Sequence, residues 1–206
     1  MQIVIADKSH SVYAQQVCDT IADAAKVRGT GIAKREARYI IEKMEKGNAV
    51  IALDGDIFAG FCYIESWGHG KFVANSGLIV HPDFRGQGLA KKIKKAIFEQ
   101  SRAKYPDAKV FSITTGLAVM KMNSDLGYKP VTFSELTDDE SFWNGCQTCK
   151  NYDVLQRTNQ SMCLCTGMLY DPNTSEEQSK QKHKFDKKVW TRLKNIKQIR
   201  FSKKDK

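Results

Sequence analysis

The sequence contains no hydrophobic run long enough to cross a membrane. The longest clean apolar stretch runs from Ile57 to Ile64, whereas a membrane-spanning helix needs about 20 apolar residues. The first residues, MQIVIADKSH, lack a basic segment and place Asp7 where a secretion signal would be apolar, so no signal peptide is expected. We therefore expect a cytoplasmic protein, in which six cysteines are more often thiols or metal ligands than a disulfide framework.

The sequence also lacks net charge outside its last residues. Of 33 Lys and Arg and 23 Asp and Glu, twelve basic and two acidic residues fall within 180–206, which leaves 21 of each sign elsewhere. The net charge of +10 therefore belongs to a tail, which lowers the expectation of a DNA-binding core. A hydrophobic content of 41% and a charged content of 27% exclude collagen-like, low-complexity and wholly disordered classes.

The hydrophobic pattern predicts a mixed sheet with helices on both faces, an α/β (α+β) class. Asp54-Gly55 is a strong hairpin signal, and Gly127 is typical of the residue that follows a helix. Strands are expected at 2–5, 49–53, 57–64, 72–80, 110–113, 152–155 and 168–170. Helices are expected at 13–25, 36–45, 89–102, 117–126 and 138–143.

We expect one domain at 1–170 and a polar linker with a basic C-terminal tail at 171–206. Residues 182–206 could form an amphipathic helix with Val189, Trp190, Leu193 and Ile196 on one side. Such a tail could bind RNA, an anionic membrane or an acidic partner. It could also pack on its own domain or on a second copy in a homodimer. We favour packing or a nonspecific anion-binding arm.

The segment from Gly77 to Ile93, GLIVHPDFRGQGLAKKI, predicts a binding site for a pyrophosphate. It reads as a strand, a turn with two closely spaced glycines, and a helix. Gly86 and Gly88 allow a tight turn that exposes consecutive N–H groups, and the positive helix N-terminus adds to the anion site. Arg85, Lys91 and Lys92 add positive charge. A Gly-rich surface turn is the alternative reading of a GxG pattern alone.

Two motifs resemble those of the GNAT N-acyltransferase superfamily. RGQGLA, from Arg85 to Ala90, resembles its R/Q-x-x-G-x-G/A loop, and the segment 118–129 resembles the family's A…LYEKLGF helix end. The resemblance implies a mixed, mostly antiparallel central sheet that is splayed between its fourth and fifth strands. It also implies that acetyl-CoA or another acyl-CoA is the co-substrate. The residues implied to hold it are Leu78, Ile79 and Val80 on the strand and Arg85, Gly86, Gln87, Gly88, Leu89 and Ala90 in the loop.

The catalytic residues of this family are only partly matched. Many members use a Tyr four residues before the helix-ending Gly to protonate the leaving thiolate, and that position is Asn123 here. An amide can donate a hydrogen bond but supplies no proton of useful pKa. A common site for the base, six residues before Val80, is Ala74. Glu65, near the end of the third strand, is the best remaining carboxylate, and a solvated strand-end glutamate is its alternative.

The segment KVRGTGIAKR, from Lys26 to Arg35, stands where the family frames its acceptor pocket. Its cations Arg28, Lys34 and Arg35 suit a small carboxylate substrate, because Arg binds carboxylates bidentately; a solvated basic loop is the alternative. The whole sequence resembles small single-domain N-acylglutamate synthase-like enzymes of arginine biosynthesis, an amino-acid biosynthesis pathway. That resemblance implies transfer of an acetyl or succinyl group to the α-amine of L-glutamate. The alternatives are a protein, peptide or small-amine acetyltransferase and a non-catalytic adaptor that binds acyl-CoA or zinc.

Four late cysteines form the pattern C-x₂-C-x₁₃-C-x-C, namely Cys146, Cys149, Cys163 and Cys165. Two close pairs of thiols can surround a tetrahedral Zn²⁺ with a structural role. Residues 146–165 would then be a zinc-knuckle insertion that pins the last two strands together and fixes the wall of the acceptor pocket. A redox dithiol and four thiols without metal are the alternatives.

Overall fold

The computed structural model describes residues 1–28 and 35–174, and every helix and strand named below lies within the compact unit Met1–Tyr170. Residues Asp171–Lys206 form a second unit. The helix expected at 182–206 and most of the predicted acceptor loop lie outside the described residues.

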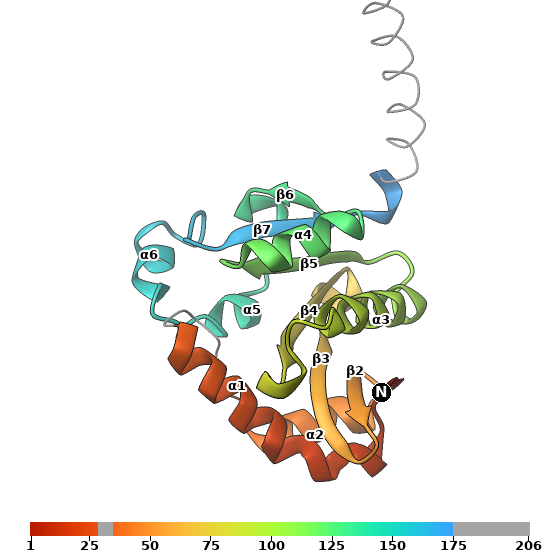
Figure 1. Cartoon of the computed structure of the whole chain (residues 1–206). Coiled ribbons are helices and arrows are strands. Elements are labelled where there is room, and N and C mark those ends of the chain that lie inside the picture. The colour runs from red at the N-terminus through yellow and green to blue at the C-terminus, as the bar shows by residue number, and fades with distance from the viewer. Residues whose placement is uncertain (29–34, 175–206) are drawn as a thin grey trace, which may run out of the picture. The chain divides into compact units, whose positions relative to one another are not determined.

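Seven strands form one sheet in the order β1-β2-β3-β4-β5-β7-β6 (Figure 1). The pair β4 and β5 is parallel and the other neighbours are antiparallel, which confirms the predicted mixed, mostly antiparallel sheet. The strands are β1 (Gln2–Ile5), β2 (Ala49–Asp54), β3 (Ile57–Trp67), β4 (Phe72–Val80), β5 (Lys109–Thr114), β6 (Lys129–Val131) and β7 (Thr166–Tyr170).

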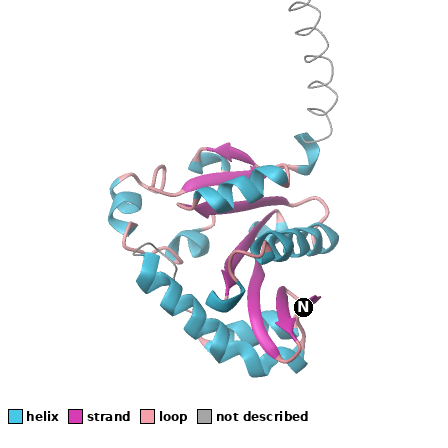
Figure 2. Cartoon of the chain, in the orientation of Figure 1, coloured by secondary structure: helices cyan, strands magenta, loops and turns pink. Residues whose placement is uncertain are grey.

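Helices cover both faces of this sheet, as predicted (Figure 2). Side chains alternate along each strand, so Tyr63 of β3 joins the core under α1 and α2, whereas its neighbour Cys62 joins the core under α3. On β5, Phe111 packs with α5 and α6, and Val110 faces the α3 side. The helices are α1 (Ala14–Arg28), α2 (Ala37–Glu45), α3 (Leu89–Lys104), α4 (Leu117–Asp125), α5 (Glu140–Asn144) and α6 (Tyr152–Arg157).

Two expectations about the end of the domain were wrong. The segment expected as a strand at 152–155 is α6, in which the Leu155 N–H bonds to the Asn151 carbonyl at 3.4 Å and Leu155 is the buried residue. The last two strands are therefore β6 and β7, and β6 was missed because it contains Pro130. A proline is tolerated there because β6 is the edge strand of the sheet.

One extra residue in β4 distorts its pairing with β3. Phe61 pairs with Ile79 but Tyr63 pairs with Ser76, so a bulge lies at Gly77. Gly77 has a φ of +65°, and a Cβ there would come within 2.4 Å of the buried Tyr63 ring. On its other side β4 pairs with β5 from Phe72 to Ala74, after which the two strands separate. This is the predicted splay between the fourth and fifth strands, and it opens the sheet beside the bulge.

Candidate active site

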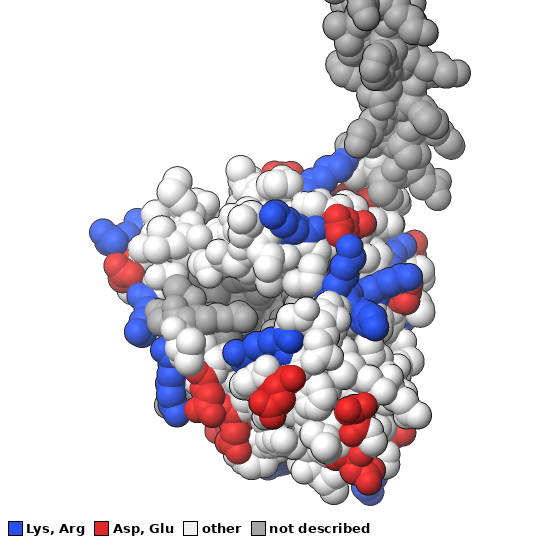
Figure 3. Space-filling view, viewed as in Figure 1, with Lys and Arg blue, Asp and Glu red and all other residues white. Residues whose placement is uncertain are grey.

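A cavity of about 1030 Å³ lies where β4 and β5 separate. One wall is residues 74–79 of β4, and the facing wall is the β5–α4 segment 111–119. In Figure 1, β3 and α1 lie on one side of this opening and β5, α4 and α5 lie on the other. Figure 3 shows that this face of the molecule is hollowed near its centre and bordered by Lys and Arg side chains. The cavity thus meets the segment that sequence analysis predicted to bind the pyrophosphate.

The loop between β4 and α3 has the backbone of an anion site. Gly86 and Gly88 have φ values of +77° and +74°, and nothing lies within 4 Å of a Cβ built on either residue. Backbone conformation, and not crowding, therefore requires glycine here. Gly88 is the N-cap of α3, whose first N–H groups have no partner within the helix. These donors fit a pyrophosphate.

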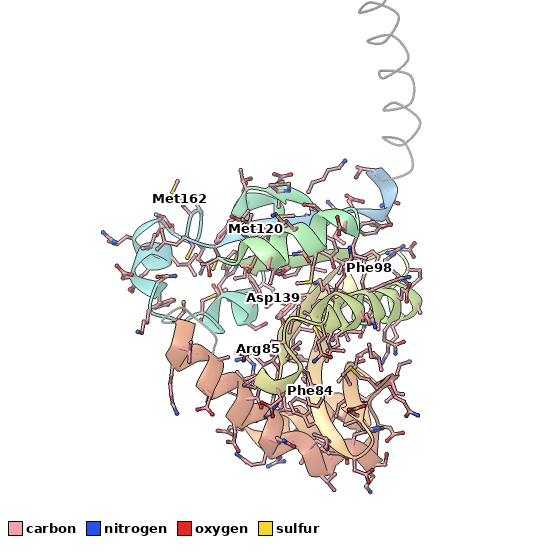
Figure 4. All side chains as sticks on the ribbon, in the orientation of Figure 1. Phe84, Arg85, Phe98, Met120, Asp139 and Met162 are labelled. Atoms are coloured by element: carbon pink, nitrogen blue, oxygen red, sulfur yellow. The ribbon has the colours of Figure 1, made fainter. Side chains whose placement is uncertain are left out.

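Two of the basic side chains at this loop, those of Arg85 and Lys91, are bonded to other groups of the protein. The Arg85 guanidinium donates through Nε to the Val80 carbonyl at 3.1 Å, which ties the loop to the end of β4 (Figure 4). Lys91 is paired with Asp125 at 2.7 Å, and both side chains are exposed. The predicted pantetheine residues Leu78 and Ile79 line the cavity, whereas Val80 and the loop residues 85–90 are not among its described lining residues. The residues predicted to hold acyl-CoA therefore follow one path along β4 and into α3.

Glu65 of β3 lines the cavity, and its carboxylate contacts a lysine of α2. Its Oε2 accepts a hydrogen bond from Lys43 Nζ at 2.6 Å, and the two side chains are 17% and 16% exposed. Burial raises the pKa of the Glu65 carboxyl to about 7, an effect that the Arg35 guanidinium opposes. Burial lowers the pKa of Lys43 to about 8. The contact with Lys43 favours the carboxylate, so Glu65 can accept a proton near neutral pH, where a general base is most effective.

Arg35 lies in the same cavity. Its Nε donates to the Tyr63 hydroxyl at 2.6 Å, and its guanidinium lies 5.8 Å from the centre of the Tyr39 ring. A planar guanidinium at the wall of a cavity is the type of group that binds a carboxylate. Of the three predicted acceptor-binding cations, Lys34 and the side chain of Arg28 lie outside the described residues.

Asn123 does not belong to the group of described side chains that line the cavity. It lies on α4 with no exposed surface, and within the described part of the chain neither its Oδ1 nor its Nδ2 has a hydrogen-bond partner. Residues 117–119 of the same helix line the cavity, and Asn123 is not among the lining side chains that the structure describes. Its predicted contact with the leaving thiolate stays a prediction.

The four late cysteines line the far wall of the cavity. Burial raises the pKa of Cys146 to about 11 and that of Cys165 to about 12, and neighbouring thiols of the group act in the same direction. Within 1–28 and 35–174, however, no three His, Cys, Asp or Glu side chains are placed to hold a metal ion. The predicted link between the last two strands is wrong, because the segment expected as a strand at 152–155 is α6. Cys146 and Cys149 lie in the turn between α5 and α6.

Sequence reasoning missed Lys43 and the aromatic side chains that frame the pocket. Trp67 and Phe142 line the cavity with ring centroids 5.1 Å apart. A signal for part of this set existed, because Tyr63, Glu65 and Trp67 alternate along one strand and must share a face. The approach of Lys43 from α2 had no such signal, since it depends on how the helix packs.

These elements place a glycine-rich anion loop at a helix N-terminus and join it, through a bulged strand, to a pocket with a buried carboxylate. Residues 33–118 match the model of the acetyltransferase (GNAT) family. Over these residues, somewhat less than half of the chain, the sequence is similar to the GNAT acetyltransferases. No helix within the described residues has the length and apolar character needed to span a membrane. A search of curated proteins found no significant match.

Solved structures share this fold at low sequence identity. N-acetylglutamate synthase from Neisseria gonorrhoeae, complexed with coenzyme A and N-acetyl-glutamate, aligns over 82% of this chain with a TM-score of 0.60 and 14% identity. This chain covers 34% of that synthase, about a third of its length. Rv2747 from Mycobacterium tuberculosis, complexed with CoA, aligns over 83% of this chain and 99% of its own, with a TM-score of 0.56 and 16% identity.

A third structure is yncA from Salmonella typhimurium, a putative acetyltransferase with its cofactor acetyl-CoA. It aligns over 84% of this chain and 94% of its own with a TM-score of 0.55 and 14% identity. These likenesses establish the fold.

Proposed function

We propose that this enzyme transfers an acyl group from acyl-CoA to the α-amine of a small carboxylate-bearing substrate, with L-glutamate as the first candidate. The observation that carries the proposal is the pairing of Arg35 and Glu65 in one cavity. Arg35 supplies a fixed cation for a carboxylate, and Glu65 supplies a base for an ammonium group. An α-amino acid carries both of these groups on adjacent atoms.

Each residue has one task in this mechanism. Arg35 binds the carboxylate of the acceptor, and Glu65 removes a proton from its ammonium group. The neutral amine then attacks the thioester carbonyl, an amide bond forms, and the carbon–sulfur bond breaks to release a thiolate, which takes up the second proton lost by the amine nitrogen. The bulge at Gly77 interrupts the pairing of β4, and its unpaired backbone is suited to donate to the developing oxyanion. Asn123 is the proposed hydrogen-bond donor to the thiolate.

The glutamate assignment rests further on the resemblance to N-acylglutamate synthase-like enzymes. It is supported by the N. gonorrhoeae structure, which holds coenzyme A and N-acetyl-glutamate. On this proposal the reaction is the first step of arginine biosynthesis, with acetyl-CoA or succinyl-CoA as the donor. A protein, lysine or polyamine acceptor is less suited, because such amines favour an acidic pocket and this one presents Arg35.

The test is thiol release from acetyl-CoA and from succinyl-CoA with each common amino acid. A blank without acceptor subtracts the thiols of the protein itself. Gly88→Trp is the loop-blocked control, because Gly88 has a positive φ at the N-cap of α3. Release with glutamate that is lost in this variant supports the proposal. Thiol release with a different amine would show that the acceptor is not glutamate. No thiol release with any amine would favour a binding protein without catalysis.

A further inference from the structure

The segment 140–165 forms one wall of the acceptor cavity but contains little regular structure. Its helices α5 and α6 span Glu140–Asn144 and Tyr152–Arg157, and neither is long enough to be stable alone. Trp143 and Leu155 anchor the segment on the core beside Phe111. The turn between the two helices and the stretch that returns to β7 hold the four cysteines. A crosslink or a bound metal would stabilise a segment with so little regular structure.

Backbone contacts around Asn151 connect the two pairs of cysteines. The Asn151 N–H donates to Cys149 Sγ at 3.4 Å, and Cys163 Sγ donates to the Asn151 carbonyl at 3.9 Å. An N–H two residues after a cysteine that points at its sulfur is the arrangement by which a turn supports a thiolate ligand. Cys149 and Cys163, which belong to different pairs, thus both contact the backbone of one residue.

The other two sulfurs lie in the same neighbourhood. Besides burial, the neighbouring thiols of Cys163, Cys149 and Cys146 all raise the pKa of Cys165, so the four sulfurs are close enough to act on one another. Cys146, Cys163 and Cys165 all pack against the same core cluster. The remaining two cysteines, Cys18 and Cys62, are buried in the other cores. The four late thiols are therefore a separate group at the cavity wall.

We propose that Cys146, Cys149, Cys163 and Cys165 bind one structural Zn²⁺ that crosslinks the insertion. Because no three of these side chains are yet placed for coordination, binding includes a closing step. In that step the thiols release their protons to solvent and the four thiolates move onto the ion. Four thiolates complete a tetrahedral site and leave no position open for catalysis. No electron is transferred, so no oxidant is required.

The site also explains how a short insertion can shape the acceptor pocket. All four cysteines line the cavity that contains Arg35 and Glu65. An ion that fixes their positions would fix that wall, and Phe142 with it. This part of the inference rests on the proposed function, whereas zinc binding itself does not.

The experiment measures metal binding by the full chain and does not depend on activity. The reduced protein is loaded with ZnSO₄, dialysed and analysed for zinc by mass spectrometry. A second sample is titrated with Co²⁺, whose d–d absorption reports tetrahedral thiolate coordination. We expect about one ion per chain and a rise in Tm of several degrees with zinc. Cys163→Ser should lose at least ten-fold in zinc affinity, and the matched variant Cys18→Ser should keep it.

Two results would overturn the proposal. One is wild-type protein that retains less than about 0.1 zinc per chain and shows no tetrahedral Co²⁺ spectrum. The other is equal zinc content in Cys163→Ser and Cys18→Ser. The Co²⁺ titration of the wild type keeps the proposal falsifiable even if Cys163→Ser does not fold. A zinc site with no effect on thiol release would uphold the metal and refute only its effect on the pocket.

Discussion

The proposed active site has two halves, one for acyl-CoA and one for the acceptor, and they are built in different ways. The acyl-CoA half consists of the β4 bulge, the loop with Gly86 and Gly88, and the start of α3, and its chemistry is carried by backbone groups. The acceptor half consists of side chains from separate elements, with Arg35 before α2, Lys43 on α2 and Glu65 on β3. One half is a continuous segment, and the other exists only after folding.

Enzymes of one fold that use acyl-CoA share the need to bind the donor, and they differ in the acceptor that they bind. A pyrophosphate is recognised by N–H groups that any sequence supplies, so glycines at fixed spacing are enough. An acceptor is recognised by a few charged side chains whose positions depend on helix packing and strand register. Substitutions in the acceptor half should therefore change the rate and the acceptor specificity. Those in the acyl-CoA half should change donor binding in the loop and stability at the buried bulge.

The largest expected effect is that of Glu65→Gln on catalysis. Loss of a general base lowers kcat/KM by about 10²- to 10⁴-fold. Since the pKa of Glu65 is raised to about 7, wild-type kcat/KM should rise as pH increases through about 7, because the base acts in its deprotonated form. The variant should lack that rise. Lys43→Met should move the midpoint to higher pH, because removal of the nearby ammonium disfavours the carboxylate.

Glu99→Gln, an exposed change on α3, is the control and should stay within a factor of two of the wild type, as surface substitutions usually do. If Glu65→Gln kept the activity and pH profile of the wild type, Glu65 would be a structural partner of Lys43 and the base would lie elsewhere.

The same division explains how far the sequence predicts the molecule. The loop at Gly86 and Gly88 and most of the element order follow from local patterns, because each is encoded within a short segment. The splay of the sheet was predicted from the family resemblance and not from any local pattern. The α6 segment was misassigned as a strand because its pattern is too short to distinguish the two periods. Lys43 could not be found, since its contact with Glu65 joins residues 22 apart through helix packing.

The second largest effect is expected for stability at Gly77. Gly77→Ala combines a φ of +65° with a Cβ 2.4 Å from the Tyr63 ring, and should lower the free energy of unfolding by about 3 kcal/mol or more. Gly86→Ala has a similar φ of +77° but open space around the Cβ, and should cost about 1 kcal/mol. Urea unfolding of both variants checks the difference. Equal losses would mean that φ alone, and not the bulge against Tyr63, requires glycine.

Arg35→Gln should affect the acceptor and not the donor. Removal of a charge-assisted hydrogen bond to a carboxylate costs about 1.5–3 kcal/mol, which corresponds to about a 10- to 100-fold rise in the KM for the acceptor. The KM for acetyl-CoA should change by less than about three-fold, because Arg35 lies on the acceptor side of the cavity. Steady-state kinetics with each substrate varied in turn separate the two. A parallel rise in both KM values would contradict the division of the site into halves.

The smallest effect is expected for Asn123→Leu, a variant that separates a structural role of Asn123 from a catalytic one. Its amide is fully buried and has no hydrogen-bond partner within the described residues, so Asn123→Leu, which keeps the number of side-chain heavy atoms and the branch point, should stabilise the domain by about 1 kcal/mol. If the amide donates to the leaving thiolate, the same variant should lose about ten-fold in kcat. Thermal unfolding and single-turnover thiol release measure the two quantities on one protein. If the variant is more stable and its kcat is unchanged, Asn123 has no part in the mechanism. The buried amide would then only lower the stability of the domain.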